Sequence, residues 1–353
     1  MCSYSMNSDI KQRYCIAIES SCDDTGIACL NLKGEVVFNE KISQTDIHAQ
    51  YGGVVPEVAS RNHIISLQKI SEKLKQVDPQ SIEMIAATTG PGLVGGLISG
   101  IMFSKGLADS INKPFYAINH LEGHLLSANI NSNSDRITFP CLMVLISGGH
   151  CQIIVAHNLG KYEVVSQTVD DSAGEAFDKI GRMLDMDYPA GPEIDQRAQL
   201  GSEDQFKFTV PKVRNDEFAM SFSGLKTNVL RTIAALPKPL TQFTINNMCA
   251  SVQHTITAAL TIRIRKVIEK YKDTIGFSQL VLAGGVAANS SVRDACVNLA
   301  NDYHMTTLMA QLQYCTDNAA MIGMAAIEKY KYGILKNTST KPRPRWSLES
   351  LES

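Results

Sequence analysis

The sequence lacks the features that mark secreted, membrane-spanning or strongly basic proteins. Its nine cysteines include no Cys-x-x-Cys pair, which favours free thiols in a reducing compartment over disulfides or a thiolate zinc site. Lys and Arg number 33 and Asp and Glu 35, so the net charge of −2 offers no global attraction to nucleic acid. The polar start of the chain shows no signal-peptide pattern. We therefore expect a cytoplasmic protein that meets any polyanion through a local basic patch.

Long apolar runs are also missing. The most apolar window, Met84–Phe103, is broken by five glycines and one proline, so we expect no membrane span. Of the 353 residues, 44% are hydrophobic and 19% are charged. This composition predicts a globular chain of about two domains.

Two stretches share one pattern, in which an apolar run is followed by a turn of small residues and two further runs. They cover residues 14–38 and 141–166, and each predicts a three-stranded meander. Duplicated domains are the economical explanation, and coincidence between two ordinary hairpins is the alternative. Helical patterns alternate with short strands through the rest of the chain, which indicates α/β layers.

A polar segment, Asn129–Asp135, is the best linker candidate because it directly precedes the second meander. We therefore expect a first lobe over residues 12–130, a second lobe over 138–335 and a basic tail over 336–353. The last helix, at about 317–333, could pack back on the first lobe.

Two histidines, His120 and His124, are spaced so that they share one face of an expected helix, and both imidazoles could reach one metal ion. The zinc-protease motif needs Glu directly after the first His, but Leu121 stands there and Glu122 falls on another face. A metalloprotease is therefore not favoured, and two surface histidines are the alternative. Asp317 is a candidate third ligand, unless it is simply a helix N-cap.

Glycine-rich turns follow two apolar strands, at Ser147–His150 and Gly284–Asn289. Such turns let the backbone approach a ligand, and free N–H groups at a helix start attract phosphate. Neither turn matches a Walker loop or the dinucleotide fingerprint. Ordinary tight turns would explain either one alone, whereas two in one chain suggest nucleotide binding.

Two acidic residues lie on the helices that follow. Asp178, one turn into a helix and beside Phe177, could hydrogen-bond ribose hydroxyls. Asp195 projects from the first turn of the next helix, after a turn in which Gly191 permits close approach.

Nine ordered segments of the chain carry a resemblance. They are Ile18–Thr25, Gly52–Arg61, Gly90–Leu97, Asn119–His124, Ser147–His150, Ala176–Lys179, Ser221–Thr227, Gly284–Asn289 and Cys315–Asn318. Together they resemble the Gcp/TsaD family of tRNA threonylcarbamoyladenosine transferase subunits, over about residues 16–331. The ending Arg343–Trp346 is similar to the bacterial branch, while residues 201–217 follow no family pattern.

The resemblance implies a duplicated two-lobe α/β fold of the actin-like, sugar-kinase-like class with a central cleft. It also implies transfer of the threonylcarbamoyl group of threonylcarbamoyl-AMP to N6 of the adenosine just 3′ of the anticodon, in tRNAs reading codons that begin with A. The implied catalytic residues are the ligands of one divalent ion, Fe²⁺ or Zn²⁺: His120, His124 and Asp317. The adenylate would be held by Leu145, Ile146, Ser147, Gly148, Gly149, Asp178, Gly191, Asp195 and Asn289. The implied partners are tRNA, a paralogous actin-like subunit and a small ATPase.

Two functions of other classes are weighed against this one. A glycoprotein endopeptidase would be favoured by a secretory signal and a correct His-Glu pair, and both are missing from the sequence. A non-enzymatic nucleotide-binding scaffold is the other, since one fold hosts many functions. An intact metal triad argues against the scaffold.

The steepest local excess of positive charge lies near the end of the sequence. Over residues 328–345 a single acid, Glu328, faces Lys329, Lys331, Lys336, Lys341, Arg343 and Arg345. Phosphate contacts supply most nucleic-acid affinity. We therefore predict that this tail contributes to a tRNA footprint near the cleft mouth, together with Arg263, Arg265 and Lys266 on the long helix. A solvated tail is the alternative.

Overall fold

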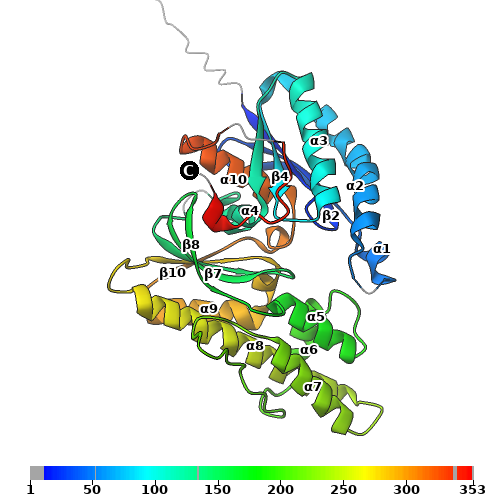
Figure 1. Ribbon diagram of the computed structural model, residues 1–353, viewed down its shortest axis with the longest axis vertical. Helices are drawn as coiled ribbons and strands as arrows, with labels where there is room; N and C mark the ends of the chain where they lie inside the picture. Colours follow the sequence, from blue (N-terminus) through cyan, green and yellow to red (C-terminus); the bar gives the residue numbers. More distant parts are fainter. Residues whose placement is uncertain (1–11, 52, 133–134, 337–339, 352–353) are drawn as a thin grey trace, which may run out of the picture.

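Two five-stranded mixed sheets form the framework of the protein (Figure 1). The computed structural model describes residues 12–51, 53–132, 135–336 and 340–351. Cys2, Gly52 and the tail residues 337–339 and 352–353 therefore lie outside the described residues. In each sheet an antiparallel meander of three strands is extended by two parallel strands. The repeat in the sequence is thus a repeat of the fold.

The first lobe is built on the first of these sheets. Its strands are β1 (Tyr14–Glu19), β2 (Asp24–Asn31), β3 (Val36–Ser43), β4 (Ile82–Gly90) and β5 (Phe115–Asn119). They lie side by side in the order β3-β2-β1-β4-β5. The helices are α1 (Thr45–Ala49), α2 (Pro56–Ile70), α3 (Val94–Ser110), α4 (His120–Leu126) and, from the end of the chain, α10 (Ala319–Lys331).

Side chains of β1 alternate between the two faces of this sheet. Ile16 and Ile18 join the core under α2 and α3, whereas Cys15 and Ala17 face α4 and α10. All four side chains are fully buried, as expected for a strand covered on both faces. The last helix of the chain therefore completes the core of the first lobe.

The second lobe repeats this plan. Its strands are β6 (Cys141–Ile146), β7 (Cys151–Asn158), β8 (Lys161–Gln167), β9 (Gln279–Ala283) and β10 (Thr306–Met309), in the order β10-β9-β6-β7-β8. The helices are α5 (Ala173–Met183), α6 (Gly191–Ala198), α7 (Ser223–Ala235), α8 (Gln242–Tyr271) and α9 (Ser290–Asp302).

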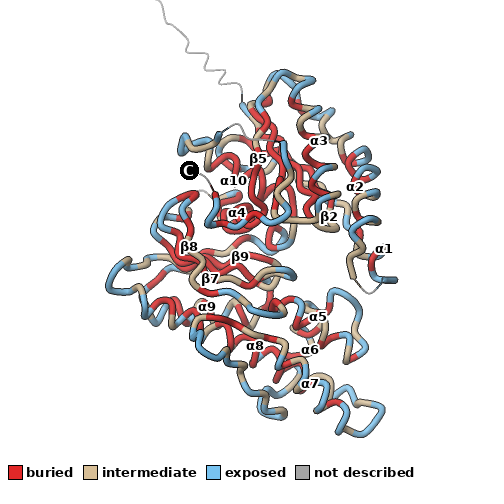
Figure 2. The backbone as a smooth tube through the Cα atoms, viewed as in Figure 1, coloured by how far each residue is buried: buried red, intermediate tan, exposed pale blue. Residues whose placement is uncertain are grey.

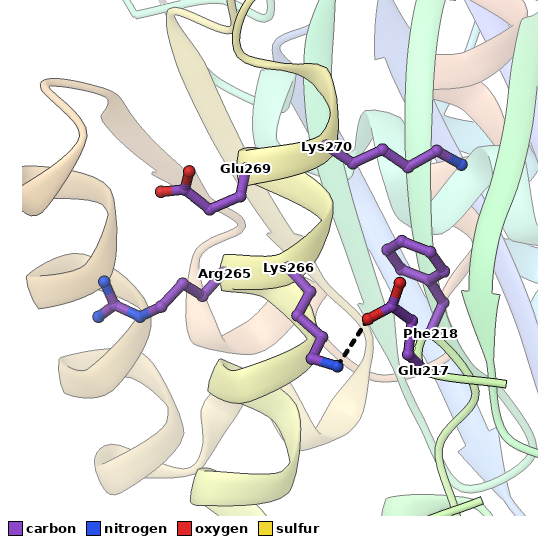
Figure 3. A pocket seen from close by; sticks show the side chains of 6 residues that line it. All are labelled: Glu217, Phe218, Arg265, Lys266, Glu269 and Lys270. Atoms are coloured by element: carbon purple, nitrogen blue, oxygen red, sulfur yellow. Dashed lines mark hydrogen bonds and ion pairs between the residues drawn. The ribbon is translucent and has the colours of Figure 1, made fainter. Parts of the chain in front are cut away.

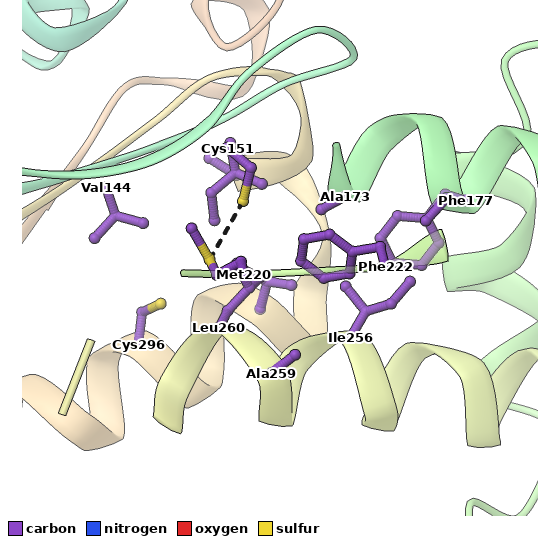
Figure 4. Close-up of a cluster of buried hydrophobic side chains, with 14 of the residues drawn as sticks. Val144, Cys151, Ala173, Phe177, Met220, Phe222, Ile256, Ala259, Leu260 and Cys296 are labelled. Carbon is purple, nitrogen blue, oxygen red and sulfur yellow. Dashed lines mark hydrogen bonds between the residues drawn. The ribbon is translucent and has the colours of Figure 1, made fainter. Parts of the chain in front are cut away.

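Two hydrophobic cores cover the two faces of the second sheet. On the outer face, Phe177 and Phe222 pack with Ile256 of the long helix α8 (Figure 4). On the inner face, Met143 and Leu145 share one core with side chains of α4 and α10. One core therefore contains buried side chains from both lobes, and Figure 2 colours the buried residues of both lobes red.

The segment expected to be a linker is packed where it is described. Asn129 and Ile130 are buried, and Asn129 Oδ1 accepts a hydrogen bond from Ile137 N at 2.9 Å. Asn131 Oδ1 accepts another from Val36 N at 2.9 Å. Residues 133–134 lie outside the described residues. The polar side chains of this segment thus form hydrogen bonds that hold it in place.

The alternative of a solvated tail is wrong for the described end of the chain. Within the C-terminal strap, as we call residues 340–351, the side chains of Trp346, Leu348 and Leu351 are buried in the core shared by the lobes. Two basic residues of the predicted patch lie before the strap and are paired. Lys329 Nζ lies 2.9 Å from Glu122, and Lys331 Nζ lies 3.6 Å from Glu328. The local excess of positive charge is therefore partly neutralised inside the fold.

Arg263 of α8 also requires a correction. Arg263 is only 5% exposed, and it donates hydrogen bonds to the carbonyl oxygens of Ala219 and Pro211. It therefore holds a loop in place and is not available to RNA. Arg265 and Lys266 lie in a separate hollow that shares no residue with the cleft cavity described below. That hollow is lined by Glu217, Phe218, Arg265, Lys266, Glu269 and Lys270 (Figure 3).

The described part of the chain contains no helix that is both long and apolar enough to cross a membrane. Its eight cysteines are all free thiols. Most of them are buried, and burial raises the pKa of the Cys151 thiol to about 12. Such thiols pack as small apolar side chains.

Candidate active site and metal centre

A cavity of about 510 Å³ lies between the two lobes. The first lobe supplies the turn after β1 (Ser21–Asp23) and the loop after β4 (Pro91–Leu93), together with His120 and Asp317. The second lobe supplies the turn after β6 (Ser147–His150) and one face of α5. Loops at the ends of the strands of both sheets therefore meet around one space, as is common for ligand sites in α/β proteins.

Three of the predicted site residues come together on one side of this cavity. His120 is the first residue of α4, directly after its N-cap Asn119, and His124 follows one turn later. Asp317 directly precedes Asn318, the N-cap of α10. Asp317 Oδ1 lies 3.0 Å from Nε2 of His124 and 3.5 Å from Nε2 of His120. The three ligand atoms lie within 4.8 Å of one another.

These residues fit a divalent metal ion by the chemistry of their donor atoms. Two imidazole nitrogens and one carboxylate oxygen suit Zn²⁺ or Fe²⁺, and three protein ligands leave coordination positions open. Both histidines are buried, so the alternative of two surface histidines is wrong. The group is therefore consistent with a metal, whose identity the geometry leaves open.

Glu19, the last residue of β1, lies beneath His120 and is 1% exposed. Its carboxylate accepts hydrogen bonds from Ser21 N at 2.6 Å and from Thr88 Oγ1. Nδ1 of His120 lies 3.1 Å from the same carboxylate. Because a carboxylate accepts, the imidazole donates its Nδ1–H to Glu19 and turns Nε2 toward Asp317, the usual arrangement beside a metal ligand.

The carboxylates around His120 also set its protonation. Burial alone would lower the pKa of His120, but Glu19 and Asp317 outweigh it and raise that pKa to about 9. Burial raises the pKa of Asp317, yet the two neighbouring imidazoles hold it well below its usual range. The pKa of His150 is shifted downward, because burial and the two histidines lower it to about 4. His150 therefore faces the cavity as a neutral imidazole at pH 7.

The turn Ser147–His150 forms the opposite wall. It is closed by a hydrogen bond from Ser147 N to the carbonyl oxygen of His150 at 2.7 Å. Gly148 and Gly149 face open space, since a Cβ on either would meet nothing within 4 Å. A Cβ on Gly174, the second residue of α5, would lie 2.7 Å from the Ser147 oxygen. Glycine at 174 thus lets α5 pack against the turn, while the two exposed glycines leave room for a ligand.

Asp178 lines the cavity from α5. Its Oδ1 accepts a hydrogen bond from Ala190 N at 2.8 Å, just before Gly191 begins α6. Burial raises the pKa of Asp178, although hydrogen bonds from the backbone of Ala190 and Gly191 oppose that effect. The carboxylate therefore both holds the turn into α6 and borders the ligand space.

Five other predicted contacts do not line the cavity, namely Leu145, Ile146, Gly191, Asp195 and Asn289. Leu145 and Ile146 are fully buried in β6, so only their backbone could reach a ligand. Asp195 accepts hydrogen bonds from the backbone and hydroxyl of Ser290. Asn289 caps α9, and its amide donates to Gln253 Oε1 at 2.7 Å. The role of these residues in binding the adenylate stays a prediction.

Several residues of the site received no role from the sequence. Glu19 had one usable signal, because a carboxylate ends an otherwise apolar strand. Tyr188 lines the cavity and stands in the turn before Gly191, but nothing in its spacing distinguishes it from a turn residue. The other lining residues without an assigned role include Glu175, Lys179 and Arg182.

Glu122 lies apart from the histidine pair, as the spacing predicted. It is fully buried and pairs with Lys329 Nζ at 2.9 Å, and Tyr162 Oη donates to it at 3.1 Å. Both carboxylate oxygens are therefore committed to other groups. Glu122 is therefore not available as the glutamate base that a metalloprotease requires.

The duplicated lobes with a cleft between them define an actin-like α/β protein. Similar structures include HypF of T. kodakarensis, with a TM-score of 0.59 and 14% identity over 93% of this chain and 49% of that one. Component A of the (R)-2-hydroxyglutaryl-CoA dehydratase of Acidaminococcus fermentans has a TM-score of 0.51 and 14% identity, over 90% of this chain and 99% of that one. These likenesses show the fold alone.

The family model described as tRNA N6-adenosine threonylcarbamoyltransferase matches residues 35–324. Enzymes with this name from Rickettsia bellii (strain OSU 85-389) and Rickettsia rickettsii (strain Sheila Smith) are each 42% identical to this chain. The alignments cover 95% and 96% of this chain and 99% of each relative. The chain therefore belongs to the tRNA N6-adenosine threonylcarbamoyltransferase family and is a transferase that modifies tRNA.

Proposed function

We propose that this chain transfers the threonylcarbamoyl group of threonylcarbamoyl-AMP to N6 of the adenosine just 3′ of the anticodon, in tRNAs reading codons that begin with A. The observation that carries the proposal is that His120 and Asp317 of the His-His-Asp cluster border the same cavity as the open glycine turn, in a chain of this family. In the reaction, N6 forms a bond to the carbamoyl carbon and the bond from that carbon to the phosphate oxygen breaks. N6 loses one proton, and AMP leaves.

His120, His124 and Asp317 are the residues that would hold one divalent ion, Fe²⁺ or Zn²⁺. Such an ion supplies Lewis-acid polarisation when bound, without a redox step. Glu19 orients His120 by accepting its Nδ1–H. His150, which is neutral at pH 7, borders the same space.

The adenylate would lie across the second wall. Its phosphate is expected at the Ser147–Gly149 turn, because backbone N–H groups suit an anion. Its ribose hydroxyls are expected at Asp178, because a carboxylate suits hydroxyl donors and repels phosphate. Leu145 and Ile146 would contribute backbone groups only, and Gly191 lies beside the Asp178 carboxylate. Asp195 and Asn289 would bound the site from α6 and the start of α9.

The expected protein partners are a paralogous actin-like subunit and a small ATPase, acting with this chain in the cytoplasm. The first lobe offers a surface for one of them. On α3, Val94, Ile98 and Met102 are spaced to share one face, and they are 50%, 44% and 62% exposed. On the adjacent α2, Ile64 and Ile65 are 64% and 65% exposed. An apolar patch of this kind is typical of a protein interface.

The test of the function is a mass-spectrometric nucleoside digest of tRNA from cells that carry variants of this chain. His124→Ala should lose the bound metal and the modified nucleoside together. The matched control is His157→Ala, because His157 is an exposed histidine on β7 that pairs only with Glu163 among the contacts described. A metal-free His124→Ala protein with full transfer activity would refute the metal assignment, and unchanged modified nucleoside in a strain depleted of the protein would refute the function.

A further inference from the structure

The C-terminal strap is attached directly to the rim of the cavity. Arg343 N donates a hydrogen bond to the carbonyl oxygen of Thr89 at 2.7 Å, and Gly92 N donates to that of Pro344 at 3.2 Å. Gly92 is itself one of the residues that line the cavity. A Cβ on Gly90 would lie 1.9 Å from the Arg343 oxygen, so the loop after β4 and the strap are in backbone contact. The basic residues at 341–345 therefore stand beside the entrance to the site.

The strap is fixed at its other end as well. The carbonyl oxygen of Trp346 accepts a hydrogen bond from Asn119 Nδ2 at 3.1 Å, and Asn119 caps the helix that begins with His120. Glu349 Oε1 accepts another from Val164 N of β8 at 3.0 Å. The strap thus spans both lobes, as the red segment in Figure 1 shows, and it holds its side chains on a fixed backbone.

The strap carries three basic side chains, Lys341, Arg343 and Arg345, and one acid, Glu349. The Glu349 carboxylate accepts a hydrogen bond from the second lobe. Lys341 and Arg345 are exposed. The guanidinium of Arg343 lies 4.6 Å from the centre of the Trp346 ring, which limits its orientations. Together with the two prolines these residues line a shallow surface hollow.

We propose that the strap is a docking rim for tRNA phosphates beside the adenosine that enters the cavity. This proposal rests on the proposed function, because an adenosine whose base enters the cavity must leave its sugar and flanking phosphates at the rim. Contacts to phosphate fix the register of a nucleic acid, and arginine forks match phosphate geometry. A strap that holds the Arg343 guanidinium against Trp346 and exposes Arg345 at that rim provides such contacts in a protein whose overall charge is slightly negative.

The experiment compares two variants of the full-length chain that each remove three positive charges. The first replaces Lys341, Arg343 and Arg345 with Ala. The control replaces Arg13, Lys75 and Lys272 with Ala; these side chains are exposed and none of them lines the cavity. The affinity for tRNA is measured against salt concentration in the assembled complex. Because each phosphate contact contributes about 0.7 to 0.9 to the slope of log K against log salt, the strap variant should lose about two units of slope. The control should keep the slope of the unaltered chain.

Two further measurements keep the result interpretable. Arg345→Ala removes one exposed charge without touching the Trp346 ring, and it should reduce the slope by about one unit. Calorimetry with AMP checks that the cavity is intact in every variant. An unchanged slope in the strap variant, or an equal loss in the control, would overturn the proposal. If the slope is unchanged and the strap variant no longer binds one of the protein subunits, the strap contacts that subunit. This result would also overturn the proposal. If the slope falls as expected but the unaltered chain modifies no adenosine, the proposed function fails and the docking rim stands.

Discussion

Replacing Glu19 with Gln tests the link between a buried carboxylate and the metal site. The change keeps the size of the side chain, and the single amide oxygen can keep the hydrogen bond from Ser21 N. It removes the negative charge that faces Nδ1 of His120 at 3.1 Å. A glutamine amide can also donate to Nδ1, which would place the ring proton on Nε2 and block that nitrogen as a ligand.

The size of the effect follows from the role of Glu19. Loss of a partner that orients a metal-binding histidine typically costs 10- to 100-fold in metal affinity, or about 1.4 to 2.7 kcal/mol. Protonation of His120 changes as well. In the unaltered protein the carboxylates raise the pKa of His120 to about 9, so metal binding at pH 7 must displace a proton. Metal affinity should therefore rise with pH up to about pH 9, and this pH dependence should weaken in Glu19→Gln.

The assay is calorimetric titration of metal-free protein with Zn²⁺ in buffers of different ionisation enthalpy, which counts the protons released. We expect about one proton released at pH 7 from the unaltered protein and a smaller fraction from Glu19→Gln. Glu83→Gln is the control, since Glu83 is a glutamate of the same lobe that pairs with Arg13 on the surface. If Glu19→Gln bound Zn²⁺ within about twofold of the unaltered protein and released as many protons, the orienting role of Glu19 would be refuted.

Three other substitutions test parts of the site and of its frame. Gly148→Ala should leave the melting temperature unchanged but weaken the binding of AMP in calorimetry, because its Cβ enters open space; unchanged affinity would move the adenylate elsewhere. Gly284→Ala should destabilise the fold by about 1 to 3 kcal/mol in urea titrations, because φ is +91° and its Cβ would lie 2.4 Å from the Ile146 oxygen; an equally stable variant would contradict this geometry. Trp346→Ala should cost about 3 kcal/mol in the same titrations, since Trp346 is 9% exposed, whereas a solvated strap would cost nothing.

The sequence was sufficient to predict the elements that follow local rules. Both meanders were visible because their apolar runs and small-residue turns are contiguous, and the structure confirms the two-lobe fold. Spacing placed His120 and His124 on one helix face, whereas the alternative of Asp317 as the N-cap of the last helix is wrong, because Asn318 caps it. In each case the relevant interaction spans only a few residues, so the pattern and the structure carry the same information.

Other features depend on contacts between distant segments, which no local pattern contains. The pairing of Glu19 with His120 joins the end of β1 to a helix that follows β5. The basic run after Glu328 was interpreted as one patch, but Lys329 turns inward to Glu122 while the strap carries Arg343 to the cavity rim. Arg263 was counted with its exposed neighbours, although its position on α8 faces the core. A run of basic residues in a sequence therefore does not show which of them are exposed, because a helix turns some of its side chains toward the core.

The topology explains why the metal cluster can depend on the whole chain. His120 and His124 belong to the first lobe, but the chain then builds the complete second sheet before Asp317 returns beside them at the start of α10. The same helix supplies fully buried side chains such as Met321 and Ile322 to the core that joins the lobes. Asp317 can therefore reach the histidines only when α10 is packed, since Asn318 caps that helix and fixes the residue before it. The three ligand atoms are brought together by the same packing that joins the two lobes, so the cluster depends on the completed fold.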